Sequence, residues 1–197
     1  MRKTGNGRFI INHNTIEDDH WKLMRIEGID EFNQFNSFCC GDDDLNDFIK
    51  TDAFTHKQEL IVETYVLKSK EATGNFPVAF ISFCNDAIPL TDLQKKTQKA
   101  FPHKKRYPNM PAVKIARLGV SSDLQRKDLG THIINMAKEF FTTDNRTGCR
   151  FITVDAYNTD NVVAFYKKND FQFLRKQDDK KQTRIMYLDL KRFFIAQ

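Results

Sequence analysis

The sequence predicts a single domain of the mixed α/β or α+β class. Two observations predict this fold. β-rich runs fill the first half of the chain, and the second half then follows the order β-α-β-α-β-β. The composition agrees, because 40% hydrophobic and 29% charged residues are globular proportions and 197 residues suffice for one ordinary domain.

The composition also excludes several classes of protein. No uncharged run approaches the roughly 18 residues that a membrane span needs, and the basic N-terminus lacks the apolar segment of a secretory signal. Neither the histidines nor the cysteines have metal-ligand spacing. We therefore expect a cytoplasmic protein without membrane contact or bound metal, in which the thiols of Cys39, Cys40, Cys84 and Cys149 are reduced and buried.

The first half of the chain is expected to begin with a polar arm over 1–20, loose apart from a short strand at 9–11, before a folded domain over 21–197. Residues 21–26 alternate apolar and polar, which predicts a strand. The acidic run 42–44 favours a capped helix over a cation site. Acidic side chains at a helix start complement its dipole, and apolar residues follow here at helical spacing.

Two further strands are predicted at 64–68 and 77–84, joined by a hairpin loop at 71–75. The following stretch, 93–117, contains no acidic residue and is interrupted by prolines. It is either a solvated loop before a strand or an electrostatic surface for a phosphate backbone. Its basic residues are Lys95, Lys96, Lys99, Lys104, Lys105, Arg106, Lys114 and Arg117.

The second half of the chain shows clearer periodicity. Apolar residues recur at helical spacing in two segments, and β-rich runs surround them. A strand, a helix, a strand, a helix and two antiparallel strands are expected at 113–120, 129–141, 150–156, 162–168, 171–175 and 184–190.

The connection between the strand at 113–120 and the following helix is suited to an anion. The first N–H groups of a helix have no partner within it, and the helix dipole is positive there, which favours a phosphate. Arg126 and Lys127 add positive charge, and Gly130 allows close approach of a ligand. An ordinary β-α connection is the alternative.

This connection resembles motif A of the GNAT acetyltransferases. In that motif an apolar strand is followed, after four residues, by Gln/Arg-x-x-Gly-x-Gly/Ala. Val120 ends the strand here, and Gln125 and Gly130 match the pattern. Asp128 stands where the pattern has its first glycine, and its carboxylate is expected to repel a pyrophosphate.

Residues 153–171 resemble motif B of the same family, a strand, an asparagine and a helix with the ending A-x-x-F-Y-x-x-x-G-F. Asn158, Asn161 and Tyr166 match it. Asp170 replaces the usual glycine, a mild departure because Asp tolerates a left-handed backbone. In this order and separation, over about residues 113–175, the motifs identify a GNAT-like domain.

The resemblance implies an α+β domain with a mixed, mostly antiparallel sheet flanked by helices, in which two splayed central parallel strands hold acetyl-CoA as co-substrate. Backbone groups of Leu118 and Val120, and Asn161, would contact the pantetheine arm, while the N–H groups of 125–131 would bind the pyrophosphate. The implied acetyl-CoA-binding residues are Leu118, Gly119, Val120, Gln125, Arg126, Lys127, Asp128, Leu129, Gly130, Thr131 and Asn161.

Tyr166 corresponds to the general acid that protonates the leaving CoA thiolate in the family. Its alternative role is that of a core aromatic on the apolar side of a short helix. A modest fall in its pKa, or a hydrogen bond to the sulfur, would suffice for the transfer, because an ordinary thiol titrates roughly 1.5 pH units below an ordinary tyrosine. No general base follows from the spacing, although His103 and Glu63 are conceivable.

Residues 38–50 resemble the F-x-C-G-x-x-x-L-x-x-F/W-L opening of a GNAT subgroup that includes toxins acetylating the amino group of aminoacyl-tRNA. The resemblance thus implies direct acetyl transfer to a primary amine, with charged tRNA on the 93–117 stretch as the toxin-like alternative. A polyamine, amino acid or peptide acceptor stays open, as does a non-catalytic CoA- or nucleic-acid-binding module, which Asp128 favours. The 18 Phe residues also leave room for a homodimer interface.

Overall fold

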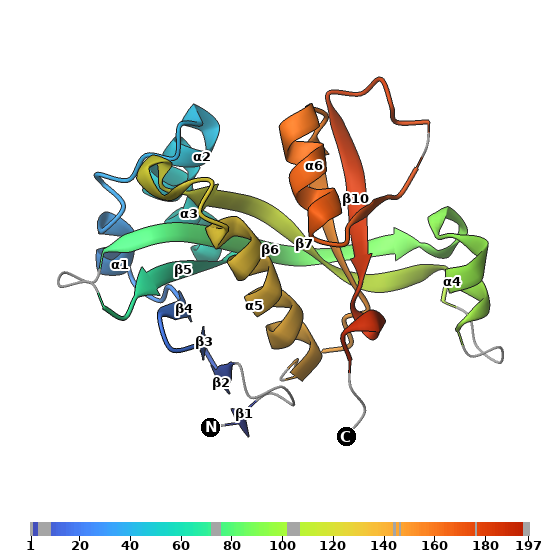
Figure 1. The fold of residues 1–197 in the computed structure, drawn as a ribbon, viewed down its shortest axis with the longest axis horizontal. Coiled ribbons are helices and arrows are strands. Elements are labelled where there is room, and N and C mark those ends of the chain that lie inside the picture. Colours follow the sequence, from blue (N-terminus) through green and yellow to red (C-terminus); the bar gives the residue numbers. More distant parts are fainter. Residues whose placement is uncertain are drawn as a thin grey trace. The chain divides into compact units, whose positions relative to one another are not determined.

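The computed structural model describes residues 2–3, 9–71, 76–101, 107–143, 145, 147–175 and 177–194 (Figure 1). Its strands follow the hydrogen-bonded order β1-β2-β3-β4-β5-β6-β7-β8-β10-β9. The chain divides into two compact units, and the long strands β6 and β7 each run through both. Unit 1 comprises Met1–Cys84, Ala116–Asn145 and Phe193–Gln197, and unit 2 comprises Asn85–Ile115 and Arg146–Arg192.

Successive antiparallel pairing builds the sheet of unit 1. Its strands are β1 (Arg2–Lys3), β2 (Ile10–Asn12), β3 (Thr15–Glu17), β4 (Trp21–Arg25), β5 (Glu63–Ser69) and the first part of β6 (Pro77–Pro89). The strands predicted at 21–26, 64–68 and 77–84 are therefore confirmed. Most of the predicted hairpin loop, 72–75, lies outside the described residues.

The polar arm differs from its prediction. β2 confirms the short strand predicted at 9–11, but β3 continues the sheet beyond it, so the expectation of a loose segment is wrong for the following part of the arm up to residue 17. The reason is burial: Phe9, Ile11 and Ile16 are each at most 3% exposed, which offsets the entropy of ordering a polar segment. The domain limits 1–20 and 21–197 themselves stay a prediction.

The helices of unit 1 are α1 (Ile29–Asn33), α2 (Asp43–Asp47), the π-helical turn η1 (Phe48–Asp52), α3 (Ala53–Gln58) and α5 (Leu129–Thr143). The Asp42 carboxylate caps α2 by accepting the Leu45 N–H at 3.0 Å, which confirms the predicted capped helix. None of the helices in the described part of the chain is long and apolar enough to cross a membrane.

Aromatic contacts account for much of the phenylalanine content. Phe80 of β6 lies at the centre of an apolar cluster, with ring centroids 5.9, 5.7 and 6.3 Å from those of Phe35, Phe38 and Phe48. Rings at these separations attract one another beyond the effect of buried area alone. The helices α1–α3 are thereby fixed against the strands of unit 1.

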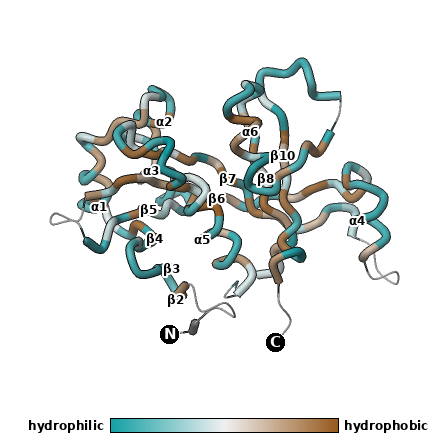
Figure 2. The backbone as a smooth tube through the Cα atoms, viewed as in Figure 1, coloured by the Kyte–Doolittle hydropathy of each residue, from teal (hydrophilic) through white to brown (hydrophobic). Residues whose placement is uncertain are grey.

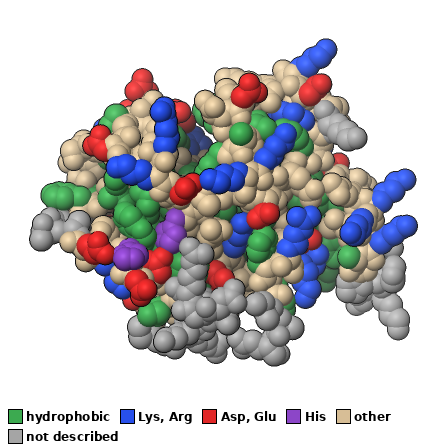
Figure 3. All heavy atoms as spheres, in the orientation of Figure 1, with side chains coloured by type: hydrophobic (Ala, Val, Ile, Leu, Met, Phe, Trp, Pro, Cys, Tyr) green, Lys and Arg blue, Asp and Glu red, His purple; other side chains and the backbone are tan. Residues whose placement is uncertain are grey.

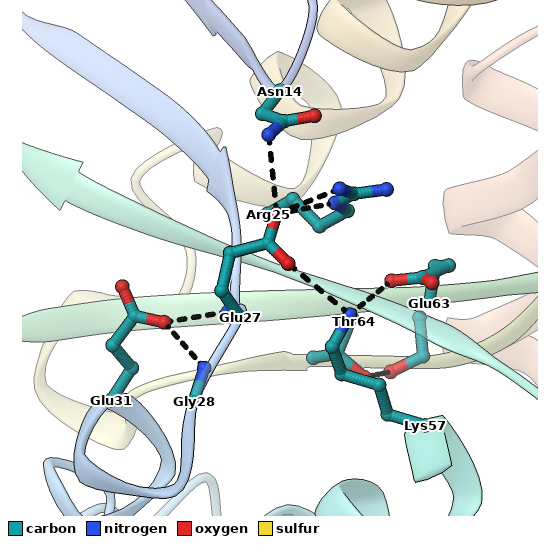
Figure 4. Close-up of polar contacts among 9 residues, drawn as sticks. Asn14, Arg25, Glu27, Gly28, Glu31, Lys57, Glu63 and Thr64 are labelled. Atoms are coloured by element: carbon teal, nitrogen blue, oxygen red, sulfur yellow. Dashed lines mark hydrogen bonds and ion pairs between the residues drawn. The ribbon is translucent and has the colours of Figure 1, made fainter. Parts of the chain in front are cut away.

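An ion-pair network holds the exit of β4 in unit 1 (Figure 4). The Glu27 carboxylate accepts hydrogen bonds from Arg25 at 2.8 Å and from Asn14 at 3.1 Å, and Lys57 bridges Glu27 and Glu63 at 3.6 and 2.9 Å. The Arg25 hydrogen bond lowers the pKa of the Glu27 carboxyl. The network thereby ties β4, α3 and β5 together at one end of the sheet.

Unit 2 contains the parallel pairing of strands that the resemblance to the GNAT family implies. β7 (Asn109–Val120) pairs in parallel with β8 (Phe151–Tyr157) through four residue pairs, from Ala112↔Phe151 to Ile115↔Val154. β8 then pairs antiparallel with β10 (Thr183–Asp189), and β10 with the short β9 (Gln172–Phe173). The helix α6 (Asp160–Lys168) follows β8, as expected.

A strap of short elements that the sequence did not predict covers an apolar cluster in unit 2. It consists of η2 (Leu90–Asp92) and α4 (Lys95–Lys99), and Figure 2 shows α4 as a hydrophilic segment. Its apolar side chains Leu90, Leu93 and Phe101 pack on the cluster formed by Ile88, Met110, Ala112, Phe151 and Tyr187. The strap is also clamped by Arg175 Nε to Asp92 at 2.9 Å and by Gln94 to Gln172 at 2.9 Å.

Lys68 gives a testable prediction about the stability of unit 1. It is 6% exposed on β5, its ammonium donates to the neutral Gln34 Oε1 at 2.8 Å, and it lies opposite Lys22. Burial, with a smaller contribution from Lys22, lowers the pKa of Lys68 below its ordinary value. The native state therefore disfavours the charged form, and stability rises as the pH increases through the native pKa towards 10.5.

We expect Lys68→Met to raise the unfolding temperature at pH 7, by roughly 2–4 °C per kcal/mol gained, and to remove the alkaline rise in stability. Thermal unfolding followed by circular dichroism from pH 6 to pH 11 measures both effects. Lys180→Met, which removes the same charge from an exposed turn, serves as the control. A less stable Lys68→Met protein would contradict the prediction.

Candidate functional site

The start of α5 in unit 1 is the part of the structure best suited to bind an anion. After Val120 the chain forms a 3-10 turn, η3 (Ser122–Leu124), and passes through 125–128 into α5. The His132 N–H donates to the Asp128 carbonyl at 2.9 Å, so the N–H groups of the preceding first turn point out of the helix end. Together with the positive end of the helix dipole they favour a phosphate group.

The two residues that stand where motifs A and B have glycine both adopt a left-handed backbone conformation. Asp128 has φ +58° and Asp170, just after α6, has φ +71°. The sequence therefore identified two positions that need this conformation, and Asp is one of the few other residues that tolerate it. Arg126, with φ +61°, adds a second left-handed residue to the loop before α5.

Gln125 holds this loop closed. Its side-chain amide donates to the Cys40 carbonyl at 2.6 Å and to the Val120 carbonyl at 3.1 Å, and its backbone N–H donates to Ser122 at 3.4 Å. Both the side-chain and the backbone donors of Gln125 are thus engaged in building the loop. We therefore restrict the predicted pyrophosphate-binding amides to those of 126–131.

The Cys39–Cys40 segment is a second support of the loop. The Cys39 carbonyl accepts the Ser122 N–H at 2.9 Å and the Ser122 hydroxyl at 3.1 Å. Cys40 is buried, as expected, but Cys39 is exposed, and hydrogen bonds from the Gly41 N–H and the Ser122 hydroxyl lower the pKa of its thiol. The prediction of a buried thiol is therefore wrong for Cys39, and Cys84 and Cys149 are only half-buried.

The end of β7 is shaped by packing against β6. A Cβ at Gly119 would lie 2.5 Å from Cε1 of Phe80, so only glycine fits here. The neighbouring predicted residues Leu118 and Val120 are half-buried. The close approach of Phe80 thus gives Gly119 a structural reason that the motif alone did not reveal.

The positive charges of this loop differ in their surroundings. Arg126 and Lys127 are exposed. Arg117 on β7 instead lies 3.4 Å from Asp44 of α2, and its guanidinium stacks over the Phe48 ring at 5.2 Å. Arg117 is therefore an internal tie of unit 1 and adds little to a basic surface.

In unit 2, α6 buries the predicted general acid. Tyr166 is 7% exposed, and its ring centroid lies 5.0 Å from that of Phe165 and 5.2 Å from that of Phe171. Burial in these surroundings raises the pKa of the Tyr166 phenol well above its usual range. The phenol is thus held in its protonated form, and burial shifts its pKa in the direction opposite to the modest fall that would suffice for the transfer.

The two asparagines of motif B have different environments. Asn161 is exposed on the first turn of α6, on the same helix as Tyr166. Asn158 donates to the carbonyls of Asp179 and Lys181 at 2.8 and 3.1 Å and so fixes the turn before β10. Asn158 is thus structural, while the role of the exposed Asn161 as a contact for the cofactor stays a prediction.

The basic stretch 93–117 is only partly available as a surface. Lysines of α4 are exposed, and Figure 3 shows Lys and Arg side chains gathered over this element. Lys114, by contrast, is paired with Asp155 at 3.0 Å and lies 3.9 Å from Asp86. Residues 102–106, with three of the predicted basic side chains, lie outside the described residues.

The structure gives no evidence for either of the two conceivable general bases, Glu63 and His103. Glu63 is ion-paired with Lys57 at 2.9 Å in unit 1, and His103 lies outside the described residues. Within the part of the chain that the structure describes, no group of three or more His, Cys, Asp and Glu side chains is arranged to hold a metal ion.

The strand order, the parallel β7–β8 ladder and the loop that opens α5 agree with the GNAT-like fold that the motifs predict. Solved structures with this fold include a tyrosine-to-phenylalanine variant of KacT, which is 18% identical with a TM-score of 0.68 over 89% of this chain and 100% of that chain. AtaT complexed with acetyl-methionyl-tRNAfMet is 20% identical, with a TM-score of 0.69 over 88% and 96% of the two chains.

AtaTR bound with AcCoA is a third structure of this kind, 17% identical with a TM-score of 0.61 over 88% of this chain and 96% of that chain. No protein-family model and no curated protein matches the sequence. At these identities the likeness establishes the fold, and it confirms the fold class that the two motifs predicted.

Asp128 provides a test of the anion site. We expect Asp128→Gly to tighten acetyl-CoA binding by roughly fivefold, because about 1 kcal/mol of charge repulsion is removed. Asp128→Asn removes the same charge and should give a similar gain. Calorimetric titration with acetyl-CoA measures the affinity, with Asp123→Asn in the same loop as the control for net charge. Weaker binding by both Asp128 variants would contradict the assignment.

Proposed function

We propose that the protein is an N-acetyltransferase that transfers the acetyl group of acetyl-CoA to a primary amine, and that its acceptor is the amino group of an aminoacyl-tRNA. The observation that carries the enzyme class is the loop of 125–128, whose left-handed residues turn the chain into the open end of α5. The likeness in fold to AtaT complexed with acetyl-methionyl-tRNAfMet supports the acceptor. So does the resemblance of 38–50 to the opening of the toxin subgroup.

The proposed binding of acetyl-CoA uses backbone more than side chains. The N–H groups of 126–131 at the start of α5 bind the pyrophosphate, and the exposed Arg126 and Lys127 add charge that offsets the carboxylate of Asp128. Backbone groups of Leu118 and Val120, together with Asn161, are proposed for the pantetheine arm. AtaTR bound with AcCoA shows that a protein of this fold accommodates that molecule.

In the proposed reaction the lone pair of the acceptor nitrogen attacks the thioester carbon. A C–N bond forms, the C–S bond breaks, and Tyr166 donates its phenolic proton to the departing sulfur. The proton that the acylated nitrogen loses then neutralises the Tyr166 phenolate, so the products are an amide and free CoA thiol. A phenol whose pKa is raised by burial arrives protonated at every physiological pH.

A cytoplasmic homodimer is the state in which we propose that the protein acts. Exposed large apolar side chains of unit 1, which a second copy can cover, support the dimer: Ile29, Leu60, Ile61 and Phe76. Sedimentation equilibrium over a range of protein concentrations decides between a monomer and a dimer.

The acceptor is tested with purified protein, labelled acetyl-CoA and fully charged total tRNA. We expect acetylated aminoacyl-tRNA, with a KM that rises steeply with salt because lysines of α4 contact phosphates without regard to sequence. Lys95→Gln/Lys96→Gln should raise the KM and flatten the salt dependence. If the label from acetyl-CoA appeared on polyamines or peptides and not on the tRNA, another amine would be the acceptor. That result would overturn the tRNA part of the proposal.

Tyr166→Phe should lower turnover by at least about tenfold while acetyl-CoA still binds, since the ring fills the same space without a proton to donate. A crystal structure of a tyrosine-to-phenylalanine variant of KacT and a structure of such a variant of AtaT have been solved, which supports the use of this substitution. Tyr107→Phe, at a tyrosine that is 68% exposed, is the matched control. Unchanged turnover in Tyr166→Phe would refute the general-acid role.

A further inference from the structure

Three neighbouring strands of unit 2 bring a set of polar side chains together. The Asp86 carboxylate of β6 accepts the hydroxyl of Thr153 at 2.5 Å and the N–H of Ala87 at 2.8 Å. Lys114 of β7 lies 3.9 Å from the same carboxylate and 3.0 Å from that of Asp155. Thr153 is 1% exposed, so the hydroxyl that orients Asp86 is itself fixed in the sheet.

These side chains share a face of the sheet with the apolar cluster beneath the strap. Ile88, Ala112 and Phe151 belong to that cluster, and each lies two residues along its strand from Asp86, Lys114 or Thr153. Because successive side chains alternate between the faces of a strand, residues two apart share a face. The polar group thus borders the apolar cluster that the strap carrying α4 covers.

The position of the group along the strands bears on the proposed reaction. Lys114↔Thr153 is the third of the four pairs of the parallel ladder, which ends with Ile115↔Val154 while β8 continues to Tyr157. In the proposed function, which this inference deepens and on which it rests, backbone groups further along β7 contact the pantetheine arm of acetyl-CoA. The side chains at the end of the ladder are then the ones that an acceptor meets.

The chemistry of Asp86 suits a protonated or hydrogen-bonding amine. Each carboxylate oxygen has about two acceptor positions, and each oxygen of Asp86 uses one of them for a fixed donor. The side chain is 25% exposed, so it remains within reach of a ligand. Two aspartates around one lysine leave a net negative charge at this point, whereas the lysines of α4 on the same unit are exposed and positive.

We propose that Asp86 binds the amino group of the acceptor, and that Thr153 is the positioning residue that holds Asp86 in place. The amine lies against the carboxylate, while the phosphates that follow it along a charged tRNA lie towards the lysines of α4. The opposite charges of these two places match an acceptor that is cationic at its reacting end and anionic elsewhere. The charge arrangement therefore favours an amine carried on a polyanion over a free polyamine as the acceptor.

The experiment compares wild type, Asp86→Asn and Asp179→Asn with fully charged total tRNA as acceptor. Asparagine keeps the shape of Asp86 and still accepts the Thr153 hydroxyl, so the variant should fold and bind acetyl-CoA as wild type does. We expect its KM for charged tRNA to rise about tenfold, because a hydrogen bond to a charged group is lost. Asp179→Asn removes the same charge from an exposed turn of unit 2 and should leave KM unchanged.

Two further measurements separate binding from a structural role. The KM difference between wild type and Asp86→Asn should narrow as the pH rises through the pKa of an α-amino group, near ~8, since the neutral amine gains less from a carboxylate. Thr153→Val should give a smaller rise in KM with unchanged acetyl-CoA affinity. Loss of acetyl-CoA binding in Asp86→Asn, or a KM effect independent of pH, would assign Asp86 to the structure instead and overturn the inference.

The outcomes also distinguish this inference from the proposed function. Acetylation of charged tRNA by wild type with the same KM in Asp86→Asn refutes the role of Asp86 alone. No acetylation by wild type refutes the proposed function, and the inference with it.

Discussion

The conformation of the candidate anion site depends on the side-chain amide of Gln125. Its two hydrogen bonds, to the carbonyls of Cys40 and Val120, close a loop in which Arg126 and Asp128 adopt left-handed backbone angles. Each such residue is unfavourable on its own by about 1–2 kcal/mol. The loop is thus held by contacts outside itself, and the direction of the first α5 amides follows from them. A phosphate gains from amides that are oriented before it binds, because no loop has to be ordered at that moment.

The helices and strands that could be predicted from the sequence are those in which apolar residues repeat with a clear period. The strands β4–β8 and the helices α5 and α6 were predicted within a few residues, because their apolar side chains repeat at 2 or 3.6 residues and are buried. The short α1 and α4 contain no full period, and the strand β3 presents only Ile16 to the core. These elements are stabilised by what they pack on, which local sequence does not show.

The positions of the candidate site residues along the chain were predictable from the motifs. The contacts that those residues make with residues far away in the sequence were not. The motifs located the loop, the helix start and Tyr166, and they marked the left-handed positions through the missing glycines at Asp128 and Asp170. The bond from Gln125 to Cys40 joins residues 85 apart in the sequence, and Gly119 is required by a ring 39 positions earlier, Phe80. Asp86 likewise becomes notable only when Thr153 is placed beside it by the sheet. No spacing rule reports such contacts.

Burial of Tyr166 has two opposing effects on the proposed proton transfer. An ordinary phenol and an ordinary thiol differ by roughly 1.5 pKa units, or about 2 kcal/mol, against donation from the phenol. Burial raises the pKa of Tyr166 and so increases this difference, if the thiolate is solvated as it is in water. A CoA sulfur that leaves into the same apolar surroundings is desolvated too, and its pKa rises for the same reason. The difference between the two groups, which sets the free energy of the transfer, then changes far less than either pKa, so a strongly shifted tyrosine remains a competent acid for a buried leaving group.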